Sequence, residues 1–159
     1  MGTLKEKDNY VLFSLGTELF GISVDKALEV LENDNISKAP DAPPHVIGVV
    51  NFRGDIVPVF DLNSRFKIPP KEGLPGVIIV IDLFADNEKV MLGIKVDKVL
   101  GVKEIFTKDI KNSPEVGVSF NPKFIDGIVQ QDEGLVYLIE PDLLVSHTDL
   151  TELDFQQDK

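Results

Sequence analysis

"FGISVDKALEV", residues 20–30, is the stretch that decides the fold, because it returns as "LGIKVDKVLGV" at residues 92–102. Seven of the eleven positions are identical at a constant offset of 72 residues. The similarity continues outward: "HVIGVV" at 45–50 is matched by "KFIDGIV" at 123–129, with one inserted residue and a proline before each. Self-similarity at a fixed period predicts that one structural unit is present twice.

Each copy begins with the pattern of a β-hairpin. In the first copy, apolar runs at 10–15 and 19–23 flank the turn "GTE"; in the second, runs at 77–84 and 89–96 flank "ADNE". More short runs follow, separated by turns such as "APDAPP" and "NSPEVG". There is too little helix to cover a parallel sheet, so the pattern favours small antiparallel barrels. The predicted fold is mainly β, with two barrels side by side.

A helical period follows each hairpin. In the first copy, apolar residues fall at i, i+3, i+4 and i+7, and Ser23 is suitable as the N-cap. The second copy has the same phase, although Gly101 weakens its end. The pattern predicts a short helix in each copy with an Asp-Lys pair in its first turn. The apolar residues are Val24, Ala27, Leu28, Leu31, Val96, Val99 and Leu100, and the pairs are Asp25-Lys26 and Asp97-Lys98.

The chain, residues 1–159, is predicted to be a single domain of two intertwined barrel subdomains. Their approximate bounds are 9–70 and 75–145, and the exchange of a strand or terminus between them is left open. Residues 146–159 are acidic, and we expect a solvated tail there.

Composition excludes several classes of function. The formal net charge of −11 disfavours nucleic acid as a partner, because binding to phosphates depends on Lys and Arg. There is no cysteine, so disulfides and thiolate metal sites are excluded. No stretch approaches the ~18 apolar residues that span a bilayer. We therefore expect a cytoplasmic protein without direct membrane insertion.

No constellation for catalysis is found. The sequence has no phosphate loop of the Walker type, no G-x-S-x-G and no H-E-x-x-H. Its two histidines, His45 and His147, are far apart and share no acidic motif. We therefore predict that the chain is not an enzyme and has no catalytic residue, no metal and no cofactor.

Comparison of the two copies separates residues needed for folding from residues that serve one task. The pairs Gly21/Gly93 and Gly48/Gly127 recur, so they are interpreted as backbone requirements. Arg53 does not recur, because the second copy has "VQQDEGL" where the first has "VNFRGDI". This difference makes three residues the first candidates for a binding site: Asn51, Arg53 and Gly54.

"NFRGDIVPVFDL", residues 51–62, resembles the N-L-R-G-x-x-x-P-x-x-D-L signature of CheW-like adaptor domains, and residues 10–30 resemble the opening of that family. The resemblance runs from about Asn9 to Leu144. In the signature, Phe52 replaces the usual leucine. Outside it, "LEND" at 31–34 stands where many members of the family have a basic residue and a glycine. The matching residues are Gly16, Gly21, Gly48, Asn51, Arg53, Gly54, Pro58, Asp61, Leu62, Gly93, Asp97 and Gly127. Six of them are expected to shape turns: Gly16, Gly21, Gly48, Pro58, Gly93 and Gly127.

The resemblance implies a pair of five-stranded, SH3-like barrels without enzymatic activity. It implies an adaptor that couples chemoreceptors, the methyl-accepting chemotaxis proteins, to a CheA-type histidine kinase. The helical tip of the receptor would lie in an apolar groove between the subdomains, and the regulatory domain of the kinase would dock by pseudo-symmetric contacts. The groove would include Ala27, Val30, Val99 and Val102. Arg53 corresponds to a functionally sensitive arginine, with Glu29 as its salt-bridge partner, and Asn51 and Gly54 would share its coupling role.

A second function stays open, a small-ligand sensor that uses the cleft between the barrels. Such a site needs polar groups that converge on an apolar cavity. Only Asn51, Arg53 and Glu29 are candidates for these groups. Which receptor or kinase is engaged also stays open.

Overall fold

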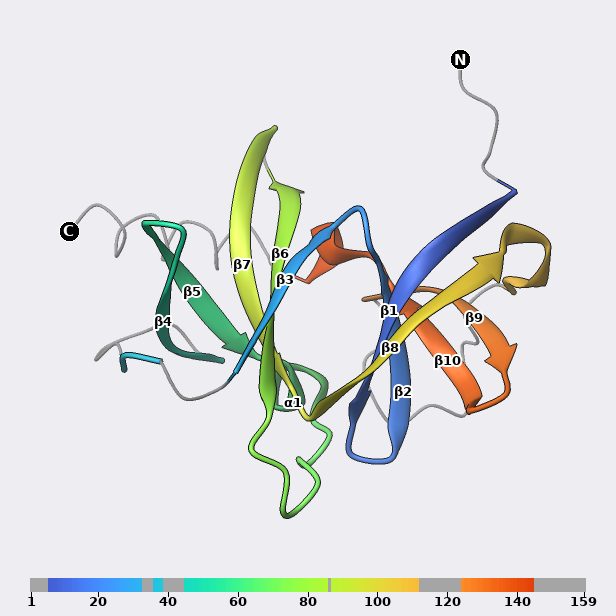
Figure 1. The fold of residues 1–159 in the computed structure, drawn as a ribbon, viewed down its shortest axis with the longest axis horizontal. Coiled ribbons are helices and arrows are strands. Elements are labelled where there is room, and N and C mark those ends of the chain that lie inside the picture. Colours follow the sequence, from blue (N-terminus) through green and yellow to red (C-terminus); the bar gives the residue numbers. More distant parts are fainter. Residues whose placement is uncertain (1–5, 33–35, 39–44, 86, 112–123, 145–159) are drawn as a thin grey trace.

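The structure is a computed structural model, and it describes residues 6–32, 36–38, 45–85, 87–111 and 124–144. In these ranges the chain forms ten strands in two five-stranded sheets, which lie on opposite sides of the molecule in Figure 1. The first sheet has the order β8 (Lys98–Phe106), β1 (Lys7–Leu15), β2 (Glu18–Ser23), β10 (Gly134–Ile139) and β9 (Ile125–Gln131). The second sheet has the order β3 (Ala27–Glu32), β6 (Val77–Ala85), β7 (Glu88–Val96), β5 (Asp55–Asp61) and β4 (Val46–Phe52).

The duplication is visible in the strand order. Each strand of the first copy has a counterpart five strands later in the second copy, so that β1 corresponds to β6 and β5 to β10. When every strand is exchanged for its counterpart, the order of the first sheet becomes the order of the second. Each sheet combines the hairpin of one copy with three strands of the other, so the copies exchange strands. The mainly β, SH3-like fold of two five-stranded sheets is confirmed. Ranges 9–70 and 75–145 each contribute to both sheets, and the subdomain bounds stay a prediction.

The predicted helices at residues 23–31 and 96–100 are wrong, because β3 and β8 are strands. A β-bulge at Leu28 shifts the register between Ala27 and Glu29, and a bulge at Leu100 does the same in the second copy. One extra residue places positions i and i+3 on the same face of a strand. This spacing imitates a helix in the sequence.

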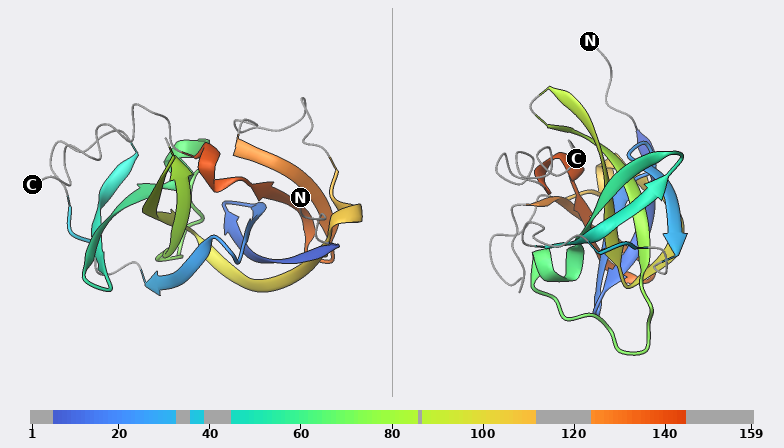
Figure 2. Two further views of the ribbon diagram at one scale, coloured as in Figure 1. Left: turned by 90° about the horizontal axis from the view of Figure 1, so that it is seen from above. Right: turned by 90° about the vertical axis from the view of Figure 1, so that its left-hand side faces the viewer.

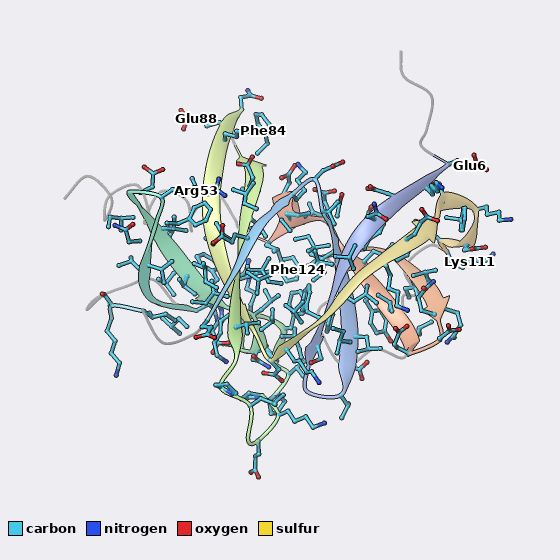
Figure 3. The ribbon with its side chains drawn as sticks, viewed as in Figure 1. Glu6, Arg53, Phe84, Glu88, Lys111 and Phe124 are labelled. Carbon is cyan, nitrogen blue, oxygen red and sulfur yellow. The ribbon has the colours of Figure 1, made fainter. Side chains whose placement is uncertain are left out.

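Helical structure is limited to short segments in the described part of the chain. They are α1 (Leu62–Phe66), η1 (Thr107–Asp109) and η3 (Pro141–Leu143). The α1 helix begins after Asp61, whose side chain accepts a hydrogen bond from the backbone of Asn63. Its Phe66 is buried and stacks on Phe124, which lies near the middle of the molecule in Figure 3.

Among the residues that the structure describes, three apolar clusters hold the fold together. The central cluster contains residues from both sheets and from α1, including Phe13, Phe20, Phe66 and Ile79. A second cluster lies within the second sheet, which consists of β3 to β7, and contains Val50, Phe52, Val57, Val59, Ile78 and Val80. A third lies within the other sheet and contains Leu12, Ile105, Val129, Val136 and Leu138. The two barrels therefore share one core and each also has its own.

Short bridging segments pack against the outer strands β4 and β9. Ser37 exchanges two backbone hydrogen bonds of 2.8 Å with Val49, and Lys111 pairs in the same way with Ile128. Gly48 and Gly127 allow this close approach, because a Cβ at either position would meet the bridging segment. Pro58 lies opposite Val49, whose backbone groups point to Ser37, so its missing N–H costs no bond to β4.

Substituting Gly48→Ala is expected to lower the free energy of unfolding by about 1 to 3 kcal/mol. The added methyl group would overlap the carbonyl oxygen of Ser37 and separate it from Val49. Urea denaturation measures the effect. As a control, Gly73→Asn changes a glycine with nothing within 4 Å of its Cβ position and introduces a residue that tolerates its positive φ. Equal losses in both variants would contradict this explanation.

Candidate partner-binding surface

Strands β3 and β8 are edge strands of the two sheets. They lie on the same face of the molecule and run in opposite directions, as Figures 1 and 2 show. An edge strand has only one neighbour in its sheet, so its side chains and its free backbone edge are accessible to a partner. The equivalent position of these strands in the two copies gives this face a pseudo-twofold symmetry.

Four apolar residues of β3 and β8 form what we call the apolar strip: Ala27, Val30, Val99 and Val102. Paired residues on neighbouring antiparallel strands point to the same face of a sheet. On β3, Ala27 pairs with Ile81 and Val30 with Ile79. On β8, Val99 pairs with Phe13 and Val102 with Val11. All four partners belong to the central cluster, so the strip continues that cluster to the surface.

In each copy, the first residue of the strip is half-buried and the second is exposed. Ala27 and Val99 are half-buried and pack against the central cluster. Val30 and Val102 are 44% and 60% exposed. The interface between the sheets is packed by the central cluster, so the predicted groove is not an open cleft through the molecule. What a partner can reach is the outer margin of this core.

The structure brings Arg53 and Glu29 together. The Nη2 atom of Arg53 lies 3.3 Å from Oε1 of Glu29, and the guanidinium also lies 4.7 Å from the centre of the Phe52 ring. Glu29 pairs with Val80, so it points to the face of β3 opposite to the strip. Because β3 and β4 are the two edge strands of one sheet, the ion pair links one edge of the sheet to the turn that follows the other edge strand. Glu29 lies on a strand and not on the predicted helix, so the arginine is bound to the edge of a sheet.

The other two candidates shape the turn that carries Arg53. The Oδ1 atom of Asn51 accepts a hydrogen bond from the backbone of Gly54 at 3.2 Å. Arg53 and Gly54 have φ angles of 52° and 87°, as a two-residue hairpin turn requires. Figure 3 shows the Arg53 side chain at the β4–β5 end of its sheet. Asn51 and Gly54 therefore support Arg53, and the coupling role of all three stays a prediction.

The second barrel has an ion pair in a similar place, between its edge strand and the turn at the other edge of its sheet. Glu133, in the turn between β9 and β10, lies 2.9 Å from Nζ of Lys103 on the edge strand β8. The hydrogen bond between the two side chains raises the pKa of Lys103 and lowers the pKa of Glu133. The two pairs do not use equivalent residues, because the strand register aligns Glu133 with Gly54 and the offset of 72 residues aligns Lys103 with Leu31. In both copies, however, an ion pair links an edge strand to the turn at the other edge of its sheet.

Asp97 was assigned to the first turn of a helix, and this assignment is wrong. Its side chain is buried, and one oxygen, Oδ2, accepts hydrogen bonds from the backbones of Gly16 at 2.7 Å and Lys71 at 2.9 Å. Its counterpart Asp25 is exposed. The family resemblance included Asp97 and not Asp25, but the sequence did not indicate that the side chain of Asp97 is buried.

A pocket of about 380 Å³ lies beside α1 and not at the strip. Its lining contains none of the three polar residues considered for a ligand sensor, and it consists of Asp61, Asn63, Ser64, Lys67, Ile68, Pro69 and Pro70. In the described ranges, no group of three or more His, Cys, Asp or Glu side chains could hold a metal ion. No helix among these residues is long and apolar enough to cross a membrane.

Comparison with known proteins agrees with the fold and the motif. Residues 9–149 match the CheW-like domain. The chain is 28% identical to the chemotaxis protein CheW of Treponema pallidum, over 96% of this chain and 91% of that protein. It is 30% identical to the CheW protein of Thermotoga maritima, over 88% of this chain and 89% of that protein.

Among solved structures, the scaffolding protein TtCheW from Thermoanaerobacter tengcongensis is similar, with a TM-score of 0.76 and 31% identity. The similarity covers 89% of this chain and 94% of TtCheW. The duplicated fold, the signature around Arg53 and the matches over nearly the whole length lead to one conclusion. The chain belongs to the CheW-like domain family.

Proposed function

We propose that this chain is a non-catalytic adaptor that couples chemoreceptors to a CheA-type histidine kinase in a cytoplasmic chemosensory array. Membership of the CheW-like family supports the function. The observation that carries the proposed site is the apolar strip, where the central core reaches the surface at Val30 and Val102. Exposed apolar residues that continue a core favour a protein partner.

The receptor tip, a helical hairpin, is the partner that we assign to the strip. An antiparallel pair of helices has its own approximate twofold axis, which matches the symmetric placement of β3 and β8. The regulatory domain of the kinase would dock elsewhere by pseudo-symmetric contacts, and the turn at Arg53 is our candidate for coupling the two. No observation favours the alternative of a small-ligand sensor.

The mechanism of such an adaptor is thermodynamic. It shifts the population of kinase-activating receptor states only by the difference in its affinity for the active and inactive geometries. Each contact would be of modest size, and many linked contacts would give the array its stability. Changes at the strip should therefore alter receptor affinity before they alter the fold.

The variants Val30→Asp and Val102→Asp are each expected to weaken binding of a chemoreceptor hairpin fragment about tenfold or more. A carboxylate would have to lose its water at a position where a valine now contributes apolar contact. Isothermal titration calorimetry measures the affinity. Leu135→Asp is the control, because Leu135 is an exposed apolar residue of β10 outside the strip. Undiminished binding by both valine variants would place the receptor elsewhere.

A further inference from the structure

Each end of the apolar strip carries a glutamate. Two residues after Val30, Glu32 pairs with Val77, which packs against the central cluster. Two residues after Val102, Glu104 pairs with Asn9 on β1. Side chains two apart on a strand point to the same face. Glu32 and Glu104 therefore lie on the face of the strip, and they occupy equivalent positions at the offset of 72 residues.

The two glutamates lie at opposite ends of the strip, because β3 and β8 run in opposite directions (Figure 1). Both are exposed. Glu104 lies 3.3 Å from Lys7, and both of these side chains are about half exposed. Within the ranges that the structure describes, no salt bridge reaches Glu32. The symmetric strip thus has an apolar centre and a negative charge at each end, one of them shared with a lysine.

We infer that Glu32 and Glu104 select a receptor hairpin that carries a lysine or arginine at each end of its apolar ridge. The inference rests on the function proposed for the strip, and it adds the chemistry of the partner. A segment with cations at both ends satisfies both glutamates, since the strip and an antiparallel helix pair share twofold symmetry. A segment with acidic residues there meets like charges, which is how an interface rejects a wrong partner.

The effect belongs to the rim of the interface. Exposed ion pairs contribute little to affinity, but rim charges change the association rate and its dependence on salt. Lys7 competes with the partner for Glu104, because its ion pair with Glu104 reduces the attraction between this carboxylate and a cation of the partner. Removing this lysine should therefore strengthen the binding of a basic segment.

The test uses the full chain and two versions of one chemoreceptor hairpin fragment. The versions differ only in having lysine or glutamate at the positions that flank the apolar ridge. Wild-type protein should bind the lysine version about tenfold more tightly at low salt, with a smaller difference at high salt. The double variant Glu32→Lys, Glu104→Lys should lose or reverse this preference. Lys7→Gln should bind the lysine version about twofold more tightly.

Glu88→Lys is the matched control, because Glu88 is exposed at the tip of the β6–β7 hairpin, away from the strip (Figure 3). Each Glu→Lys change raises the net charge by two, so this variant makes half the change of the double variant, and it should keep the wild-type preference. Equal affinity of wild type for both versions, or an unchanged preference in the double variant, overturns the inference. If Val30→Asp still weakens binding in that case, the proposed function stands. If Val30→Asp also has no effect, the strip is not the receptor site.

Discussion

Substituting Arg53→Asp is expected to abolish receptor-dependent control of the kinase and to change the melting temperature by only a few degrees. The Arg53 side chain is 69% exposed, and its ion pair with Glu29 contributes roughly 0 to 1 kcal/mol to stability. Aspartate also tolerates the positive φ angle of the turn better than most residues. The guanidinium has further donors beyond the one used for Glu29, which a partner can engage.

The measurement is kinase autophosphorylation in a reconstituted mixture of receptor, kinase and this chain, with and without attractant. The second barrel supplies the control, because Lys103→Glu places two carboxylates in the ion pair that links its own edge strand β8 to the β9–β10 turn. If Arg53 acts through a partner, only the Arg53 variant loses control of the kinase. Loss in both variants would show that the link between the edge strand and the turn is what matters, and retained control in both would remove Arg53 from the mechanism.

Much of the fold was predictable because the chain repeats itself. The repeat indicated two equivalent units, and both predicted hairpins are present as β1–β2 and β6–β7. The helices were predicted wrongly because a bulge at Leu28 or Leu100 gives a strand the same i, i+3 spacing as a helix. Periodicity alone cannot distinguish a bulged strand from two turns of helix.

The candidate site was predictable in its members but not in its surroundings. The Arg53–Glu29 pair and the four residues of the strip came from the family resemblance, and the structure places the pair within 3.3 Å and the strip on one face. The packed interface was not predictable, since it depends on contacts such as Phe66 with Phe124 between distant segments. The second ion pair was missed because neither Lys103 nor Glu133 occupies the position that corresponds to Glu29 or Arg53 in the repeat.

Asp97→Ala is expected to be the most destabilising of these changes, with a loss of about 3 to 5 kcal/mol in the free energy of unfolding. Asp97 is 4% exposed, and its Oδ2 is the acceptor for the backbone N–H groups of Gly16 and Lys71. Truncation would leave two donors without a partner, and a hydrogen bond to a charged group contributes more than a neutral one. These bonds join the β1–β2 turn, the segment after α1 and the junction of β7 with β8.

The internal repeat provides the matched control, since Asp25→Ala changes the equivalent but exposed aspartate and should alter stability by less than about 0.5 kcal/mol. Urea denaturation of both variants measures the difference. Asp97→Asn should lose less than half as much as Asp97→Ala, because its amide oxygen can occupy the position of Oδ2 and accept both bonds. Equal losses from Asp25→Ala and Asp97→Ala would mean that the two backbone hydrogen bonds do not stabilise this junction.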